Sequence, residues 1–409
     1  MNISRYIANR IVGQKHSSYS GFIVRLATAA TAVSLATMIV TVSLVNGFQH
    51  EVSDKVYSFW GHMRVQALEP YRSMVAEETP IHASDSVENI LAAQPGIQHV
   101  QAFGARSVVL RTAGQFDGVL LKGVDHRFAS SPFKRFLKAG TMLQFPDSGY
   151  SSQLMLSESM ARQLQVKVGD TVSTIFLRNG EDMRSRRQVV CGLFSTGIEE
   201  YDKNFVLADL RFLQRLNLWT SAQIGGYEVW FDEPAKASLL EKGITKALPQ
   251  GIVASPIADI YPNIFDWLGI QNQTKQIVIG IMLAVAIINL ITCLLILVLE
   301  RTRMVALLAA MGMPQQSLRN IFWHYAARIA GRGIAIGLGL SLGLLLLQQQ
   351  FHFIPMDEKT YYVSSVPVHI IWWQVAAIAG GTFVICLLAL RLPLSILQRI
   401  SIIKALRFN

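Results

Sequence analysis

The chain has 409 residues, of which 51% are hydrophobic and only 16% are charged, and its formal net charge is +10. Its mean hydropathy of +0.34 is too high for an ordinary water-soluble protein. We therefore expect part of the chain to lie in lipid, and we attribute the positive charge to membrane topology and lipid headgroups rather than to nucleic-acid binding.

Four segments are long and apolar enough to cross a bilayer as helices, which takes roughly 20 residues each. They cover residues 26–46, 276–299, roughly 326–347 and 368–390. The first follows a leader with four cations, is longer than a signal-peptide core and is not followed by an A-x-A-like cleavage site. We therefore expect an uncleaved membrane anchor.

The third segment carries two arginines, Arg328 and Arg332, in its first turns. A charge at mid-bilayer costs several kcal/mol, so these side chains are expected to reach the lipid headgroups or to face protein. The glycines that follow are Gly333, Gly337, Gly339 and Gly343. They include small-xxx-small spacings that let helices approach closely, and we expect plain helix packing here.

The distribution of charge predicts the orientation. Residues 1–25, 300–332 and 391–409 hold 13 Lys and Arg and a single acid, whereas residues 49–274 hold 22 Lys and Arg and 24 Asp and Glu. Excess Lys and Arg beside membrane spans mark the cytoplasmic side. Both termini and the loop 300–325 are therefore expected in the cytoplasm, with residues 49–274 on the opposite side.

The segment outside the membrane, residues 49–274, is long enough for one large or two small domains. Its two ends have similar patterns: HMRVQAL, SDSVENILAA and IQHVQAFGARSVVLR near the start, and GGYEVWFDE, PAKASLLEKGITKAL and GIVASPIADI near the end. Each end is typical of strand, helix, strand, which predicts a split ferredoxin-like α+β module. Residues 113–205, with a hairpin signal at Asn179-Gly180, predict a β-rich insertion.

The sequence carries no motif for chemistry. There is no G-x-x-x-x-G-K-[ST], H-E-x-x-H or G-x-S-x-G string and no cluster of Cys and His. Of the three cysteines, Cys191 lies outside the predicted spans and Cys293 and Cys386 lie within them, so no disulfide framework is expected. The spans lack the Asp and Glu that a proton relay needs. We predict no catalytic residue and no metal, and energy for transport must come from another chain.

A short helix is predicted after the second span. From Arg301 onward, Met304, Leu308 and Met311 recur on one apolar stripe, and Gly312 with Pro314 ends the helix before the next apolar segment. A short amphipathic helix of this kind either lies in the headgroup layer or docks into a groove of a partner. The residues alone leave both alternatives open.

Seven strings follow one another along nearly the whole chain. They are TVSLVNGFQHEV, VLLKGVDH, LSESMARQLQVKVGDTV, GLFSTGIEEYDKNFVLADL, LVLERTRMVALLAAMGMPQQSLRNIF, PMDEKTYYVSSVPV and ISIIKALRF. In this order they resemble the FtsX/MacB-type permeases of ABC transporters, and most closely the LolC/LolE lipoprotein-releasing branch. The resemblance implies a membrane protein with four transmembrane helices plus a large periplasmic α+β domain, in the bacterial inner membrane.

The resemblance and the patterns together predict seven parts of the chain. These are the cytoplasmic N-terminus with the first span (1–48), the periplasmic domain (49–274), the second span (275–299), a cytoplasmic coupling helix (300–325), the third span (326–347), a periplasmic loop (348–367), and the fourth span with the cytoplasmic C-terminus (368–409).

By resemblance, the segment after the second span is the coupling helix that docks on a cytoplasmic ATPase. The residues that correspond to it are Glu300, Arg301, Arg303, Met304, Leu307, Leu308 and Met311. The implied partners are a LolD-like ATPase dimer, which would carry ATP and Mg, and a second permease copy or a paralogue. No cofactor is expected on this chain itself.

The resemblance further implies that a lipoprotein leaves the outer leaflet through an apolar cavity and passes to a LolA-like periplasmic carrier. The residues that match the cavity walls are Met38, Val42, Val45, Phe48, Ile264, Leu268, Tyr361, Tyr362 and Val366. The alternative for each is an ordinary packing or lipid-facing side chain, or an interfacial aromatic belt for the tyrosines.

A candidate surface for the carrier lies beside the predicted hairpin. It consists of Arg178, Arg184, Arg186 and Arg187. The alternative is a solvated strand edge whose charges discourage pairing with other strands.

Two other functions stay open. One is an FtsX-like signalling scaffold that regulates a cell-wall hydrolase and moves nothing; the other is MacB-like mechanotransmission for efflux. The large insertion at residues 113–205 disfavours the first, and the lack of a fused nucleotide-binding domain disfavours a MacB chain proper.

Overall fold

The computed structural model describes residues 19–68, 79–130, 132–177 and 183–389. The chain forms two compact units. The first, here called the helical unit, comprises Met1–His50, Leu268–Pro355 and Ser365–Asn409, and the second, the sheet unit, comprises Glu51–Trp267 and Met356–Ser364.

Four helices are long and apolar enough to cross a membrane. They are α2 (Tyr19–Trp60), α9 (Pro262–Glu300), α11 (Gln315–Phe351) and α13 (Trp372–Ala389). The first three have 42, 39 and 37 residues, well beyond the roughly 20 that a bilayer needs. Both α2 and α9 continue as helices past their apolar runs. The C-terminal end of α2, from Glu51, and the N-terminal end of α9, up to Trp267, belong to the sheet unit.

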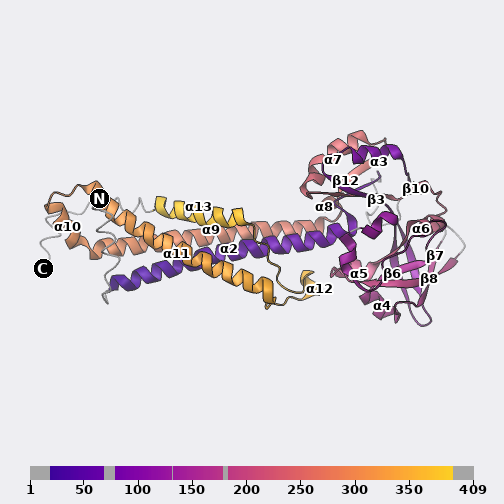
Figure 1. Cartoon of the computed structure of the whole chain (residues 1–409), viewed down its shortest axis with the longest axis horizontal. Helices are drawn as coiled ribbons and strands as arrows, with labels where there is room; N and C mark the ends of the chain where they lie inside the picture. Colours follow the sequence, from indigo (N-terminus) through magenta and orange to yellow (C-terminus); the bar gives the residue numbers. More distant parts are fainter. Residues whose placement is uncertain (1–18, 69–78, 131, 178–182, 390–409) are drawn as a thin grey trace. The chain divides into compact units, whose positions relative to one another are not determined.

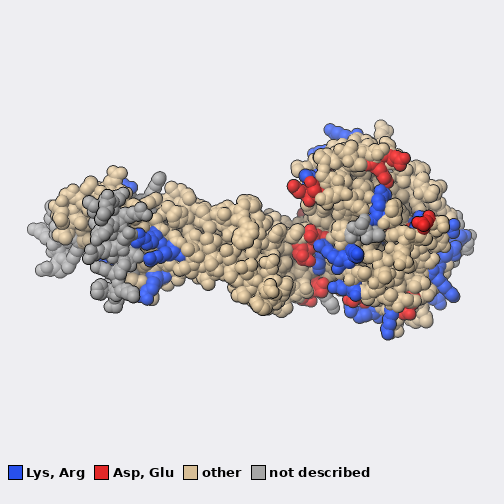
Figure 2. All heavy atoms as spheres, viewed as in Figure 1, with Lys and Arg blue, Asp and Glu red and all other residues tan. Residues whose placement is uncertain are grey.

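The helical unit has an apolar core made of side chains from several helices. Leu290 and Leu294 of α9 pack with Phe322 and Ala330 of α11 and with Ala27 of α2. Figure 1 shows α2, α9, α11 and α13 in this unit, with the short helix α10 (Thr302–Ala310) joined to the end of α9. On the visible face of this unit in Figure 2, Lys and Arg gather at one end, next to a surface that is almost entirely uncharged.

The glycines of α11 divide into two kinds. A Cβ on Gly333 would lie 2.9 Å from Thr31 Cβ, and one on Gly337 would lie 2.7 Å from Ala32 O, so the backbones of α11 and α2 approach closely at these two positions. Gly339 and Gly343 face open space within 4 Å. The predicted helix packing therefore depends on two of the four glycines.

Replacing Gly337 with Ala is expected to lower the free energy of unfolding by about 1–3 kcal/mol, since the added methyl group meets backbone that cannot move aside. The matched control is Gly339→Ala, which should be neutral or slightly stabilising because alanine favours helices by about 1 kcal/mol over glycine. Thermal unfolding of the two purified variants in the same detergent would compare them. Equal stability would show that α2 and α11 do not touch at Gly337.

The sheet unit contains a ferredoxin-like module. Its strands are β1 (Met63–Ala67), β3 (Ile97–Arg111), β11 (Gly226–Phe231) and β12 (Ile252–Pro256). They lie in the order β12-β1-β11-β3 with antiparallel pairing throughout. Helices α3 (Asp85–Ala92) and α7 (Ala235–Ala247) connect the strand pairs and cover one face, where Val87, Leu91 and Ile244 pack against Val65 and Val229. The predicted split α+β module is confirmed.

The chain between β3 and β11 adds further strands to the same sheet. They are β4 (Phe116–Val124), β5 (Leu137–Gly140), β6 (Gln153–Ser157), β7 (Thr171–Leu177), β8 (Met183–Phe194) and β9 (Phe205–Asp209). The long strand β3 pairs with β11 in its first half and with β4 and β7 in its second half, so it joins the two parts. Strands β7 and β8 pair antiparallel, as the hairpin signal predicts, and the turn at Asn179-Gly180 lies outside the described residues.

Shorter elements complete this unit. They are the two-stranded ladder of β2 (Ile81–His82) and β10 (Gln223–Ile224), the 3₁₀ turns His126–Ser130 and Pro132–Phe136, and the helices α4 (Glu158–Leu164), α5 (Glu199–Asn204), α6 (Leu210–Asn217), α8 (Ile257–Ile260) and α12 (Glu358–Tyr361).

Candidate functional site

The short helix α10 presents an apolar face to solvent. Val305 and Ala306 are buried, and Leu308 packs partly against the core of the helical unit. Leu307 and Met311, one turn apart, are 58% and 76% exposed. The stripe of Met304, Leu308 and Met311 that the spacing predicts is thus divided, and the free face is centred on Leu307 and Met311.

The connection between α9 and α10 is short and held by the backbone. Glu300 is the last residue of α9, and Arg301, with φ −101° and ψ 16°, is the single residue between the two helices. Arg301 N donates to Leu297 O at 3.1 Å, and Thr302 Oγ1 donates to Leu299 O at 2.8 Å. The side chain of Arg303, another predicted coupling residue, lies outside the part of the chain that the structure describes. A force on α10 would therefore be passed directly to α9.

Helix α10 ends at Ala310 and α11 begins at Gln315. The break lies at the positions that the sequence predicts, because Gly312 adopts φ +88°, which disfavours a side chain, and Pro314 occupies the N-cap of the next helix. Residues 315–325 are continuous with the apolar part of α11.

The predicted cavity residues differ in exposure. Met38, Val42, Ile264 and Leu268 are buried, and Met38 is part of an apolar core with Leu35 and Ile39. The half-buried members are Val45, Phe48, Tyr362 and Val366, and Tyr361 is 42% exposed. The buried members pack within the chain, and the role of all nine in a cavity stays a prediction.

A polar network in the helical unit lies beside two of these residues. Asn46, between Val45 and Phe48, donates from Nδ2 to Gln374 Oε1 at 2.6 Å and accepts from Lys275 Nζ at 3.1 Å. It connects α2, α9 and α13 through side chains. A polar side chain between apolar helices costs free energy when it lacks a hydrogen-bond partner. These hydrogen bonds therefore fix the three helices relative to one another.

The sheet unit contains a charged network that the sequence analysis missed. On the sheet face opposite α3 and α7, Lys122 Nζ lies 2.7 Å from Glu228 Oε1, and both side chains are fully buried. Gln101 Nε2 donates to Glu228 Oε2 at 2.7 Å, and Arg64 lies opposite Glu228 in the ladder. A signal was present: VLLKGV and GYEVWF each carry one charge in an otherwise apolar strand.

This network holds the end of α2. The last carbonyls of a helix lack partners within it. Lys122 Nζ donates to Phe59 O, and Trp230 Nε1 donates to Tyr57 O at 2.9 Å. A cation at a helix C-terminus also interacts favourably with the helix dipole. Two side chains of the sheet therefore bond two of the last four carbonyls of the first apolar helix.

An aromatic cluster surrounds the same helix end. Phe59 stacks on Tyr201 with ring centroids 4.9 Å apart, and Trp60 stacks on Tyr261 at 5.7 Å. Phe205 contacts both Phe59 and Trp60 edge to face. Tyr261 immediately precedes α9, so the chain entering α9 packs on the chain leaving α2.

The STGIEEYD string has a defined structural role. Asp202 accepts hydrogen bonds from Thr196 N at 2.9 Å and Thr196 Oγ1 at 2.7 Å, and from Ser195 Oγ and Gly197 N at 3.3 Å each. Burial raises the pKa of Asp202 above its ordinary value, and these hydrogen bonds oppose the rise. Asp202 thus fixes the loop that precedes Tyr201.

This loop meets a cation on α2 and the segment Met356–Ser364. Lys55 Nζ donates to Tyr362 O at 2.7 Å and lies 3.9 Å from Glu358 Oε1. Gly197, at φ +74°, leaves room for the pair, because a Cβ there would lie 2.5 Å from Lys55 Nζ. Trp267 contacts the Tyr362 ring at 6.0 Å. Three segments that are distant in sequence therefore meet here, the end of α2 with Lys55, the loop with Gly197, and Met356–Ser364.

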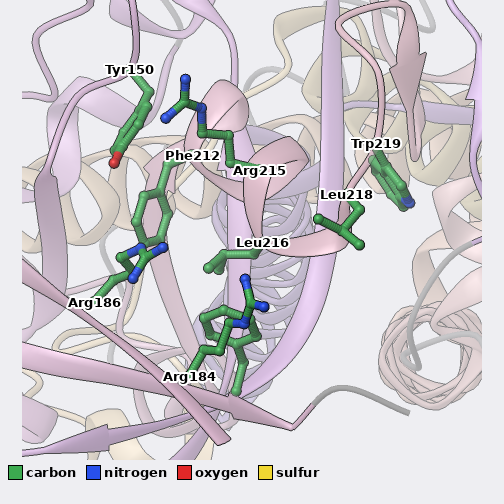
Figure 3. A pocket seen from close by; sticks show the side chains of 9 residues that line it. Tyr150, Arg184, Arg186, Phe212, Arg215, Leu216, Leu218 and Trp219 are labelled. Carbon is green, nitrogen blue, oxygen red and sulfur yellow. The ribbon is translucent and has the colours of Figure 1, made fainter. Parts of the chain in front are cut away.

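The predicted arginine surface is divided by the alternation of strand β8. Arg184 and Arg186 line a pocket, shown in Figure 3, with Arg215 of α6. Arg187 falls on the other face of the strand, since successive side chains alternate, and Arg178 lies outside the described residues. Among the described residues, no group of three or more His, Cys, Asp or Glu could hold a metal ion.

The fold and these contacts define a membrane protein with four candidate membrane helices and a mixed α/β domain that holds the end of the first helix. The MacB-like periplasmic core domain family matches residues 26–247, and the FtsX-like permease C-terminal family matches residues 276–402. The chain belongs to this FtsX/MacB family of ABC-transporter permeases. It is the non-catalytic membrane subunit, and the ATPase of such a transporter is a separate chain.

Relatives match over nearly the full length. The lipoprotein-releasing system transmembrane protein LolE of Haemophilus influenzae is 22% identical over 94% of each chain. The LolC protein of Xylella fastidiosa strain 9a5c is 20% identical over 97% of this chain and 96% of its own. The LolC protein of Haemophilus influenzae is 22% identical over 100% and 99%. These similarities and the apolar helices indicate an inner-membrane protein.

Two solved structures are also similar to part of the chain. The extracellular domain of the ABC-type transporter YknZ from Gram-positive bacteria has a TM-score of 0.34 and 14% identity, covering 47% of this chain and 98% of its own. The periplasmic region of MacB from Actinobacillus actinomycetemcomitans has a TM-score of 0.34 and 18% identity, covering 49% and 91%.

Proposed function

We propose that this permease extracts lipoproteins from the outer leaflet of the inner membrane and passes them to a LolA-like periplasmic carrier. The observation that carries the proposal is the similarity to LolE and LolC over 94–100% of this chain, which includes both units. Relatives named for lipoprotein release match every part of the chain that such a task would use.

The energy would come from a LolD-like ATPase dimer that binds ATP and Mg and docks on the exposed face of α10. In the proposed orientation, both termini and residues 300–325 are cytoplasmic and residues 49–274 are periplasmic, as the excess of Lys and Arg favours. The single-residue connection at Arg301 supports this role, since movement of a docked α10 would displace α9.

The physical need for an apolar path supports the remaining steps. Moving acyl chains through water costs about 0.8 kcal/mol for each CH₂ group, which reaches tens of kcal/mol for a triacylated lipoprotein. We propose that the predicted cavity residues line this path in an assembly with a second permease copy or a paralogue. Val45, Phe48, Tyr361, Tyr362 and Val366 are the strongest candidates because they are exposed or half-buried in the single chain.

The sheet unit would transmit the motion and meet the carrier. Helix α2 is continuous from Tyr19 to Trp60, and the sheet holds its last carbonyls through Lys122 and Trp230. Displacement of α2 would therefore be passed to the sheet. The carrier would dock near strands β7 and β8, where the sequence predicts a basic surface of Arg178, Arg184, Arg186 and Arg187 for an acidic partner.

Depletion of the protein tests the proposal directly. In cells that depend on it, a radiolabelled outer-membrane lipoprotein should remain in the inner-membrane fraction, and its complex with the periplasmic carrier should disappear. A plasmid copy of the wild-type chain should restore release. If depleted cells release lipoproteins with normal kinetics and instead show a defect in cell-wall hydrolysis, the transport function is rejected in favour of the signalling function.

A further inference from the structure

A pocket of about 390 Å³ lies in the sheet unit between helix α6 and the β7–β8 hairpin (Figure 3). Its size falls in the usual range for small-ligand sites, about 300–1,000 Å³. The walls are aromatic in four places, at Tyr150, Phe176, Phe212 and Trp219. Such walls provide flat apolar surface at a low cost in side-chain entropy.

Three arginines give the pocket its charge. Arg184 and Arg186 alternate along β8 and share one face, and Arg215 comes from α6. None of the residues that line the pocket is acidic. Among the described residues, the structure gives these three guanidinium groups no carboxylate partner: Arg186 Nη1 donates to Ser185 O at 3.3 Å, and Arg215 lies over the Tyr150 ring at 5.1 Å.

Three like charges around one hollow repel each other, and an anion between them relieves the repulsion. A concave site with low-dielectric walls concentrates this field beyond what the same charges produce on a flat surface. Guanidinium groups match carboxylate and phosphate in geometry and can donate two parallel hydrogen bonds to either.

We propose that this pocket binds a small amphiphilic anion, with one carboxylate or phosphate held by Arg184, Arg186 and Arg215 and a compact apolar body against the aromatic walls. The inference goes beyond the proposed function, because the ligand is a small molecule and neither the lipoprotein nor its protein carrier. A small molecule is favoured over a protein surface because stable protein interfaces bury about 800 Å² on each partner, whereas this site is a hollow with room for one small group.

Such a ligand would contact two elements at once. It would bridge α6, which carries Phe212 and Arg215, and β8, which carries Arg184 and Arg186. Binding would therefore fix the position of the hairpin relative to α6.

The experiment uses the full chain in lipid nanodiscs and the probe 5-phenylvalerate, with its neutral amide as a matched ligand. Titration calorimetry should show saturable binding of the acid and at least 10-fold weaker binding of the amide. Arg184→Gln and Arg215→Gln should each weaken binding of the acid about 10-fold, because each removes one pair of charge-assisted hydrogen-bond donors. Arg187→Gln, on the other face of β8, is the control and should leave binding unchanged.

A second probe, 4-phenylbutyl phosphate, distinguishes carboxylate from phosphate. The probe that binds more tightly identifies the head group of the natural ligand. Equal binding of acid and amide, or an equal loss in Arg187→Gln, would overturn the proposal. So would binding of an acidic peptide that is sensitive to Arg184→Gln when neither small probe binds. Lipoprotein release should be retained in Arg215→Gln, which lies outside the predicted carrier surface, whatever the binding result, so failure here leaves the proposed function untouched.

Discussion

Replacing Leu307 with Glu is expected to reduce ATPase docking and stimulated ATP turnover by about 10-fold or more. The side chain is 58% exposed on α10, beside Met311 at 76%. Apolar side chains at the centre of an interface contribute roughly 2 kcal/mol or more each, and a buried charge there adds a desolvation cost. Co-purification of the ATPase with the tagged permease, followed by its turnover in proteoliposomes, would measure the loss.

The matched control is Leu239→Glu on α7, where the same substitution replaces a side chain that is 78% exposed in the sheet unit. It should leave docking unchanged. Leu308 is a poorer test position, because it packs partly against the helical core and a charge there would also disturb folding. Full co-purification and normal turnover with Leu307→Glu would show that α10 does not dock the ATPase.

Replacing Glu228 with Gln is expected to destabilise the sheet unit by about 3–5 kcal/mol. The substitution leaves Lys122 without its counter-charge in a fully buried site, and Arg64 opposite adds a second cation. Breaking a buried pair by removing one partner has this magnitude because an uncompensated charge remains. Chemical unfolding of the purified chain, followed by tryptophan fluorescence, would detect the change, since Trp60 and Trp230 lie in or beside the network.

A double variant separates the ion pair from general loss of packing. Lys122→Met combined with Glu228→Gln removes both charges and should recover part of the lost stability. It should not restore the cap on α2, because methionine cannot donate to Phe59 O. Destabilisation below about 1 kcal/mol in Glu228→Gln, or a double variant less stable than both single ones, would contradict the assignment of this network.

Local patterns in the sequence were enough to predict the four apolar helices. Hydropathy is a property of short segments, because in lipid each helix satisfies its own backbone hydrogen bonds. The ends of the helices were less accessible: the first apolar run at 26–46 is part of a helix from Tyr19 to Trp60. Its last turns are held by contacts with the sheet, which hydropathy does not register.

The ferredoxin-like module was also predictable, because each strand, helix, strand unit has its own periodicity and turn signals. The order β12-β1-β11-β3 followed from that topology. The insertion was recognised as β-rich, but its strands join the same sheet through the second half of β3. Strand partners far apart in sequence are set by packing rather than by local pattern.

The exposed face of α10 depends partly on the sequence pattern and partly on tertiary packing. Spacing alone placed Met304, Leu308 and Met311 on one stripe, and any helix of that sequence has it. Which side of α10 meets the core was decided by Val305 and Ala306, which are both buried, and Val305 belongs to the apolar core that α9 and α11 also form. The free side therefore contains Leu307 as well as Met311.

The sequence by itself determined the four apolar helices, the short break at Gly312 and Pro314 and the class of the α+β domain, because each depends on residues within a few turns or strands. Only the tertiary structure decided that Lys122, Glu228 and Phe59 meet, that Lys55 joins Glu358 and Tyr362, and that Arg184 and Arg215 line one pocket. These groups come from distant parts of the chain, so no local pattern specifies their contacts. For the fully buried Lys122, the cost of burying the charge is offset by Glu228.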